Sequence, residues 1–304
     1  MLYIGANNLV NEKMKRLFPF FAFLTFGYSS ASAQLLWKIS GEGIESPSYL
    51  LGTHHFCTGE FCDSIPGFYE AFSQVEQVCT EVDINSFNKV NSPEFQRKLR
   101  GYMSLPEGVT LSSFYSKEEF DEIAKYLSPY FGNNPEVYRG LKPITLIINI
   151  QNIIMIELMP EFESSSGIDQ YVQELAAEEG KKSIGLESVE FQMELLYNTP
   201  LEDQALQLLE LCRNGGIKEE AMELTDAYKA KNLKKLDKLT RKGCDKEEYE
   251  TMVKGRNVAW TETIVDNIST TPTLFAVGAG HLPGKYGLIE KKRKKGYQVE
   301  AILQ

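Results

Sequence analysis

The chain has 304 residues, of which 42% are hydrophobic and 11% aromatic, so it can bury a sizeable core and is not an intrinsically disordered chain. Its formal net charge of −10 disfavours nucleic acid as a partner, because phosphates bind to basic surfaces.

The first 33 residues are expected to lie outside the fold. Residues 14–33, MKRLFPFFAFLTFGYSSASA, combine a basic start, an apolar run and an exit of small residues, which is typical of a secretory signal peptide. We expect translation to begin at Met14 and cleavage to follow Ala33, leaving 34–304 as a single domain. The apolar run is shorter than the roughly 20 residues of a membrane span. The sequence therefore predicts a periplasmic or secreted protein without a membrane span in the mature chain.

The predicted strands carry all three histidines of the chain near their ends. Strands are expected at 35–40 and 48–53, and the second leads into His54 and His55. Another strand, 273–278, leads into His281, so both His55 and His281 stand in a Gly-x-x-His pattern. Neighbouring residues on a strand face opposite sides, so we expect His55 to enter a site and His54 to pack or to form a hydrogen bond.

Helices are predicted between these strands. Ser92-Pro93 and Ser116 with Glu119 indicate two helix starts, and residues 143–160 indicate a core helix bounded by prolines. Further helices are expected at 168–179, 188–213, 217–239 and 246–268, and further strands at 75–83, 182–186 and 297–303. The predicted fold is mixed α/β, with a central sheet assembled from both chain ends, a helical middle, and pseudo-symmetric halves that each end a strand in Gly-x-x-His. Ligand sites of open α/β sheets lie at such strand ends.

The five cysteines are interpreted through the predicted export. In an oxidising compartment Cys57 and Cys62 are close enough in sequence to form a disulfide bond, and Cys212 with Cys244 could form a second. A zinc site of Cys57, Cys62 and His55 is an alternative use of the same spacing. Cys79 lies in an apolar run and is expected to be a small buried side chain.

Several polar residues stand where they could take part in chemistry. Glu81 and Glu187 each follow a predicted strand, and Asp169 lies at the start of a predicted helix, where it could instead interact with the helix dipole. Asn257 shares a helical stripe with Val253, Trp260 and Ile264, which places an amide where the core should be. Its neighbour Arg256 can reach the same region. The basic run KKRKK at 291–295 ends at Gly296 and is expected to complement a helix terminus.

These motifs, in this order, resemble the TraB/GumN family. The resemblance rests on YLLGTHH, TEVD, GIDQYVQELA, GLES with Gln192, RN with Trp260, and FAVGAGHLPGKYGLIEKKRKKGYQV, and it spans about residues 35–303. It implies an erythromycin-esterase/ChaN-like fold. For the related Tiki branch it also implies a divalent-metal-dependent peptidase that uses the two histidines and glutamates. The matching positions are His55, Glu81, Glu187, Arg256, Asn257 and His281, whereas His54 departs from the apolar residue more usual there.

We therefore expect a metal-dependent hydrolase, peptidase-like, acting on a peptide or small-molecule substrate. His55, Glu81 and His281 would hold Mn²⁺, Co²⁺ or Zn²⁺, Glu187 would be the general base, and Arg256 or Asn257 would stabilise the oxyanion. Neither HExxH nor Gly-x-Ser-x-Gly occurs, so zincin and serine-nucleophile routes lack support. The alternatives are a non-catalytic protein that binds a metal, haem or small ligand in the same cleft, and an interaction protein whose motifs only build the fold.

Overall fold

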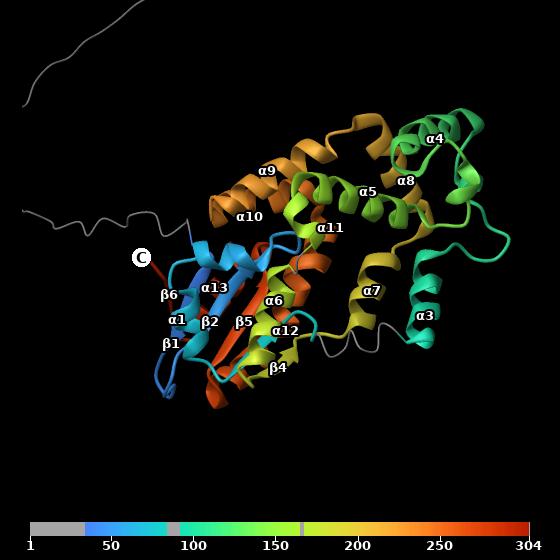
Figure 1. Cartoon of the computed structure of the whole chain (residues 1–304). Coiled ribbons are helices and arrows are strands. Elements are labelled where there is room, and N and C mark those ends of the chain that lie inside the picture. The colour runs from blue at the N-terminus through green and yellow to red at the C-terminus, as the bar shows by residue number, and fades with distance from the viewer. Residues whose placement is uncertain (1–33, 84–91, 165–166, 304) are drawn as a thin grey trace, which may run out of the picture. The chain divides into compact units, whose positions relative to one another are not determined.

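The computed structural model describes residues 34–83, 92–164 and 167–303, and everything below refers to these residues (Figure 1). The predicted signal peptide and its cleavage point lie outside them.

Six strands form one mixed sheet in the order β4-β3-β5-β2-β1-β6. Their bounds are β1 Leu36–Ser40, β2 Ser48–Thr53, β3 Gln77–Thr80, β4 Lys182–Gly185, β5 Thr273–Gly278 and β6 Gln298–Ala301. The four strands β4, β3, β5 and β2 are parallel neighbours, and β1 pairs antiparallel with both β2 and β6. The predicted mixed α/β class, with a sheet drawn from both chain ends, is confirmed.

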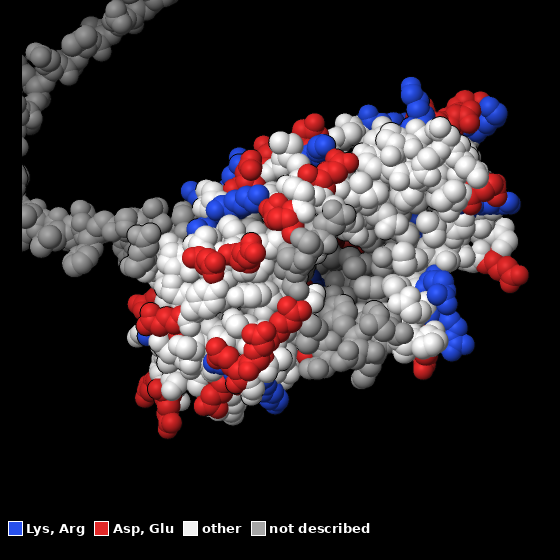
Figure 2. Space-filling view, viewed as in Figure 1, with Lys and Arg blue, Asp and Glu red and all other residues white. Residues whose placement is uncertain are grey.

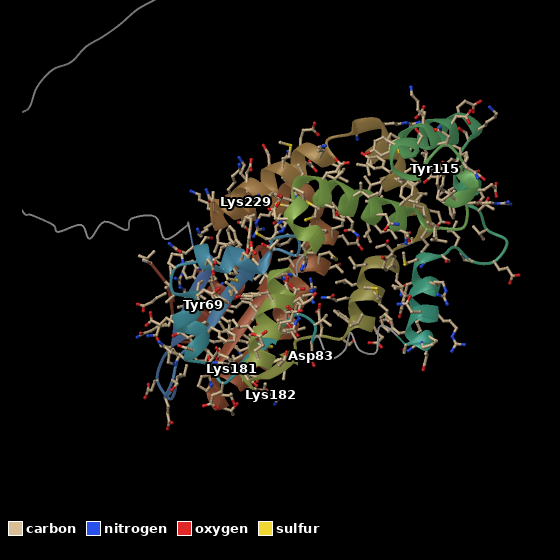
Figure 3. All side chains as sticks on the ribbon, in the orientation of Figure 1. Tyr69, Asp83, Tyr115, Lys181, Lys182 and Lys229 are labelled. Atoms are coloured by element: carbon tan, nitrogen blue, oxygen red, sulfur yellow. The ribbon has the colours of Figure 1, made fainter. Side chains whose placement is uncertain are left out.

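The parallel strands all end at the same edge of the sheet. Because β4, β3, β5 and β2 run parallel, their carboxyl ends lie together and their amino ends lie at the opposite edge. In Figure 3, Asp83 is labelled just after the carboxyl end of β3, and Lys182 is labelled at the amino end of β4. The segments that leave β2, β3, β4 and β5 therefore start side by side.

Helices occupy most of the middle of the chain. Their bounds are α1 Phe68–Ser73, α3 Pro93–Met103, α4 Lys117–Phe131, α5 Pro143–Leu158, α6 Ile168–Glu178, α7 Val189–Tyr197, α8 Leu201–Asn214, α9 Ile217–Lys229, α10 Leu233–Gly243, α11 Lys246–Tyr249, α12 Arg256–Thr270 and α13 Leu288–Lys294. Short 3₁₀ turns are η1 Gly59–Ser64, η3 Leu111–Phe114, η4 Pro135–Val137, η5 Pro160–Ser164 and η7 Ala279–His281, and η6 Glu250–Gly255 is a π-helix. The predicted caps at Ser92 and at Ser116 with Glu119 are present.

Two large hydrophobic clusters and a small one around Val82, Phe95 and Val189 make up the interior of the described residues. The larger surrounds the sheet and includes the β-strand residues together with Trp260 and Ile264 of α12. The second lies among the middle helices, around Leu127, Ile150 and Leu208. The predicted core stripe runs from η6 into α12 and is confirmed, because Val253, Asn257, Trp260 and Ile264 are all buried.

The two Gly-x-x-His motifs lie on neighbouring parallel strands, but their registers differ. Gly52 pairs with Val277, whereas Gly278 pairs with Thr53. The glycines also have different neighbours: a Cβ on Gly52 would lie 3.1 Å from the Cα of Ala279, and one on Gly278 would lie 3.2 Å from Glu81 Oε1. The expected equivalence of the two halves is therefore not confirmed.

The segment predicted as a core helix forms α5, and no helix among the described residues is long and apolar enough to cross a membrane. The cysteines differ in part from the sequence predictions. Cys79 is buried, as predicted. The described cysteines are free thiols, with Cys57 and Cys62 both buried, so no disulfide bond is formed in this structure.

On the face shown in Figure 2, acidic and basic side chains are interspersed.

Candidate functional site

Four parallel strands each deliver one predicted site residue to the same sheet edge. Glu187 follows β4, Glu81 follows β3, His281 follows β5, and His55 follows β2. Because the strands are neighbours in that order, residues more than 200 positions apart come together. The helix α12 adds Arg256 and Asn257 in its first turn.

The guanidinium of Arg256 contacts three buried side chains of the site, those of Glu81, Glu187 and His281. Its Nη2 donates to Glu81 Oε2 at 2.5 Å and to Glu187 Oε1, and its Nε donates to Glu187 Oε1 at 3.1 Å. Nη1 lies 3.1 Å from Nε2 of His281, and the guanidinium carbon lies 4.6 Å from the ring centre of Trp260. Trp260 Nε1 also donates to Glu187 Oε2 at 3.0 Å. Both carboxylates and the guanidinium are buried, and the single positive charge of Arg256 is shared between two negative charges.

Asn257 determines which ring nitrogen of His281 carries the proton. Its Nδ2 donates to the backbone oxygens of His281 at 3.1 Å and Tyr286 at 3.0 Å, so its Oδ1 must face the histidine ring. Nδ1 of His281, 2.9 Å from this oxygen, is therefore the donor, and Nε2 accepts from Arg256. Burial lowers the pKa of His281 to about 4, which keeps the ring neutral at pH 7.

Glu81 is ionised although it is buried. Burial alone would raise the pKa of its carboxyl, but neighbouring His281, Arg256 and His55 and the Gly278 N–H lower it to about 2. Because the His281 ring is neutral, we assign most of this stabilisation to Arg256. Gln192 Nε2 donates to Glu81 at 3.2 Å and to Glu187 at 2.8 Å, which links the two carboxylates a second time.

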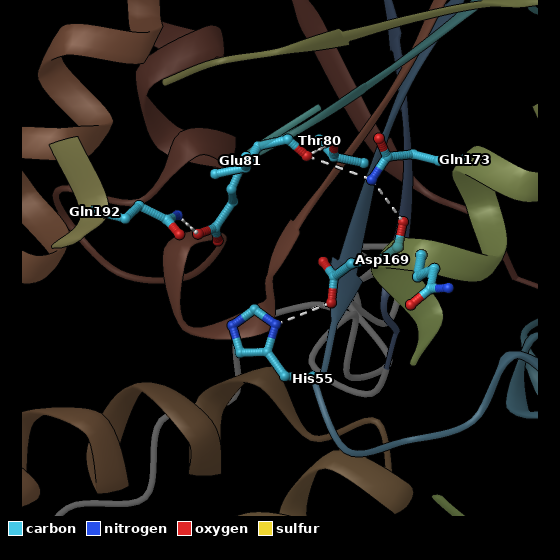
Figure 4. A pocket seen from close by; sticks show the side chains of 8 residues that line it. His55, Thr80, Glu81, Asp169, Gln173 and Gln192 are labelled. Atoms are coloured by element: carbon cyan, nitrogen blue, oxygen red, sulfur yellow. Dashed lines mark hydrogen bonds and ion pairs between the residues drawn. The ribbon is translucent and has the colours of Figure 1, made fainter. Parts of the chain in front are cut away.

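A cavity of about 320 Å³ opens beside Glu81. The residues that line it are His55, Thr80, Glu81, Val82, Asp169, Gln170, Gln173 and Gln192, and all except Val82 have polar side chains (Figure 4). The volume is at the lower end of the roughly 300–1,000 Å³ of ligand pockets, so it suits a small molecule or one residue of a peptide.

His55 and Asp169 form an ion pair at this cavity. Nδ1 of His55 lies 3.0 Å from Asp169 Oδ2, and Thr53 Oγ1 donates to Asp169 Oδ1 at 2.6 Å. The His55 side chain is 66% exposed, and its Nε2 has no hydrogen-bond partner among the residues that the structure describes. The charge of Asp169 raises the pKa of His55 to about 9. The pair thus presents an oriented imidazole with one nitrogen directed away from its carboxylate.

The predicted site residues therefore fall into two groups. His55 and Glu81 line the cavity, whereas Glu187, Arg256 and His281 form the buried network that contacts Glu81 from behind. Asn257 is fully buried with all its polar atoms bonded, which makes it a positioning residue for His281.

Sequence reasoning missed the pairing of Asp169 with His55. The sequence showed only an acid in the first turn of a helix, and the contact spans 114 positions. His54 behaves as predicted, because its Nδ1 accepts from Phe56 N at 3.2 Å and its ring packs 5.1 Å from that of Tyr228.

The arrangement does not suit a divalent metal as it stands. Nε2 of His281 and Oε2 of Glu81 are both engaged by Arg256, and Oε1 of Glu81 accepts from Gly278 N at 2.8 Å. Within the described part of the chain, no group of three or more His, Cys, Asp or Glu side chains is placed to hold a metal ion. A metal would need new positions for Arg256 and His55. The predicted metal site and the predicted cofactor stay predictions.

Residues 35–301 match a family model described as the TraB/PrgY/gumN family. No curated protein and no solved structure matches the chain.

Proposed function

The chain belongs to the TraB/PrgY/gumN family, and we propose that this member is an exported, peptidase-like hydrolase whose reaction takes place in the cavity between His55 and Glu81. The observation that carries the proposal is the His55–Asp169 pair, 3.0 Å apart at the cavity wall. Export rests on the signal-like residues 14–33.

In the proposed reaction His55 is the general base. Asp169 accepts a hydrogen bond from Nδ1–H, so the neutral ring is held in the tautomer whose Nε2 has a lone pair for a water proton. Thr53 orients Asp169, which limits rotation of the pair. A positioned general base contributes about 10²–10⁴-fold to a rate.

The raised pKa of His55 sets the pH dependence. Because Asp169 stabilises the protonated ring, His55 loses its proton only as pH rises toward about 9. A reaction that needs the neutral ring should therefore speed up with increasing pH across this range. If His55 instead acts as an acid, the rate should fall across the same range.

The test is a mass-spectrometric cleavage screen of mixed peptides with the chain from Gln34 onward. His55→Ala and Asp169→Asn should each lower cleavage by about 10²–10⁴-fold. His54→Gln is the matched control, because that ring packs on Tyr228 and does not line the cavity; it should stay within a few fold of wild type. Cleavage that survives His55→Ala would overturn the role of His55. A folded chain that cleaves nothing but takes up a ligand would favour the non-catalytic binding protein.

A metal-dependent form of the same hydrolase is the second candidate. It is favoured by His55 and Glu81 lining one cavity and by Glu81 Oε1 lying 3.8 Å from His281 Nε2. In this form His55, Glu81 and His281 would hold a divalent ion that would acidify water, Glu187 would be the general base, and Arg256 would have to leave its present position. Cleavage that is lost on chelation and restored by Mn²⁺, Co²⁺ or Zn²⁺ supports it. Cleavage unchanged by chelation contradicts it.

A further inference from the structure

Arg256 contacts every group that could attract a cation in the buried network. Its nitrogens lie within hydrogen-bond distance of Glu81 Oε2, of both oxygens of Glu187, and of Nε2 of His281. Two carboxylates and one imidazole lone pair are the donor types that divalent metals use in proteins. A single guanidinium takes up the contacts that such an ion would use.

The surroundings hold the guanidinium in that place. Trp260 stacks against it and the backbone oxygen of Met252 accepts from its Nη1 at 3.4 Å. Asn257 directs the Nε2 lone pair of His281 toward it, as described above. Glu81 and Glu187 also raise the pKa of Arg256, although burial by itself would lower it. An arginine is not deprotonated in proteins, so the positive charge is permanent.

We infer that Arg256 is the built-in cation of the Glu81, Glu187 and His281 cluster, and that its guanidinium excludes a divalent metal ion from these three side chains. The cluster without Arg256 would hold two buried carboxylates and one neutral imidazole with no compensating charge. Such a donor set should then bind a divalent ion in place of the guanidinium. Which cation occupies the cluster does not depend on whether the chain cleaves any peptide.

The experiment measures metal binding by dialysis against Mn²⁺ followed by metal analysis, together with thermal unfolding with and without Mn²⁺. Mn²⁺ is chosen because carboxylate ligands suit it and thiols do not, whereas Zn²⁺ would also bind the free cysteines. Wild type should retain no stoichiometric Mn²⁺ and show no shift in Tm. Arg256→Met, which keeps an unbranched side chain against Trp260 and removes the charge, should retain about one ion per chain and gain a Tm that rises with Mn²⁺ concentration. Arg256→Lys keeps a cation and should behave like wild type.

Ligand identity is tested in the Arg256→Met background. Adding Glu187→Gln or His281→Ala should weaken Mn²⁺ binding at least tenfold, since each removes one of three donors. If Arg256→Met does not fold by itself, the inference requires that Mn²⁺ restores folding, and failure of that rescue overturns it. A folded Arg256→Met that binds no Mn²⁺ overturns it as well. A wild-type chain that binds one Mn²⁺ ion and loses it on His281→Ala also overturns it, and would support the metal-dependent candidate function.

Discussion

Asn257 is the residue whose replacement should affect the buried network most directly. Its Nδ2 donates to two backbone oxygens while its Oδ1 accepts from His281, so an acidic oxygen in place of Nδ2 would face two carbonyls without a proton. Asn257→Asp should lower the free energy of unfolding by about 2–4 kcal/mol. Urea denaturation measures this loss. The exposed Asn198 is the control position, where Asn198→Asp should change stability by no more than about 0.5 kcal/mol.

His55 offers a direct measure of its pair with Asp169. An NMR titration should show a pKa well above the usual 6.5, and Asp169→Asn should return the pKa toward 6.5, because the carboxylate is the largest cause of the shift. A raised folded-state pKa means that the stabilisation is complete below about pH 6.5 and is lost as pH rises toward 9. Its size should stay under about 1 kcal/mol, because the ring is 66% exposed. A wild-type pKa near 6.5 would contradict the pairing.

Between secondary-structure elements, the start of α6 packs closely against the segment that follows β2. Ile168 N donates to Cys57 O at 3.0 Å, and a Cβ on Gly167 would lie 2.4 Å from the backbone oxygen of His55. Gly167→Ala should therefore push the two segments apart, at a cost of about 1–3 kcal/mol, and should shift the His55 pKa back toward 6.5. Gly101→Ala in α3, where a Cβ meets nothing within 4 Å, should be neutral or stabilising. Equal effects of the two substitutions would refute this packing argument.

One lysine of the basic run at the end of α13 is buried. Lys292 is fully buried, with its Nζ donating to Thr261 O at 2.9 Å, and burial lowers its pKa to about 7. The folded chain thus binds fewer protons than the unfolded chain between about pH 7 and 10.5, so this residue should make stability rise with pH there. Lys292→Met should remove that rise, by up to a few kcal/mol, in urea denaturation at pH 7 and 9.5. Lys294→Met on the exposed side should keep it.

At the scale of the whole molecule, the buried network should govern stability in acid. His281 has a lowered pKa of about 4, so protonation of the unfolded chain destabilises the fold as pH falls from about 6.5 to 4. Glu81, with a pKa of about 2, adds a second loss as pH falls from about 4.5 to 2. Glu81→Gln should lower stability at pH 7 by about 1–3 kcal/mol, because its amide nitrogen would face the N–H of Arg256 or of Gly278 where a carboxylate oxygen now accepts. It should also flatten the lower of the two losses. Urea denaturation at pH 7, 5 and 3.5 measures both effects, and an unchanged slope below pH 4.5 would disprove the role of Glu81.

Local patterns in the sequence were enough to predict the secondary-structure elements and the family. Apolar alternation and the capping residues at Ser92 and Ser116 predicted the elements, and the motif order predicted the family. The positions of His55, Glu81, Glu187 and His281 after strands followed from the same patterns. Only the tertiary structure decided which of these residues meet. The order of four parallel strands, with β5 from the end of the chain between β2 and β3, brings His281 beside Glu81. The first turns of α6 and α12 then give Asp169 to His55 and Arg256 to the carboxylates. No local pattern carries this information, because each of these contacts joins segments far apart in the chain, and the charge of each group depends on the burial and the partners it meets there.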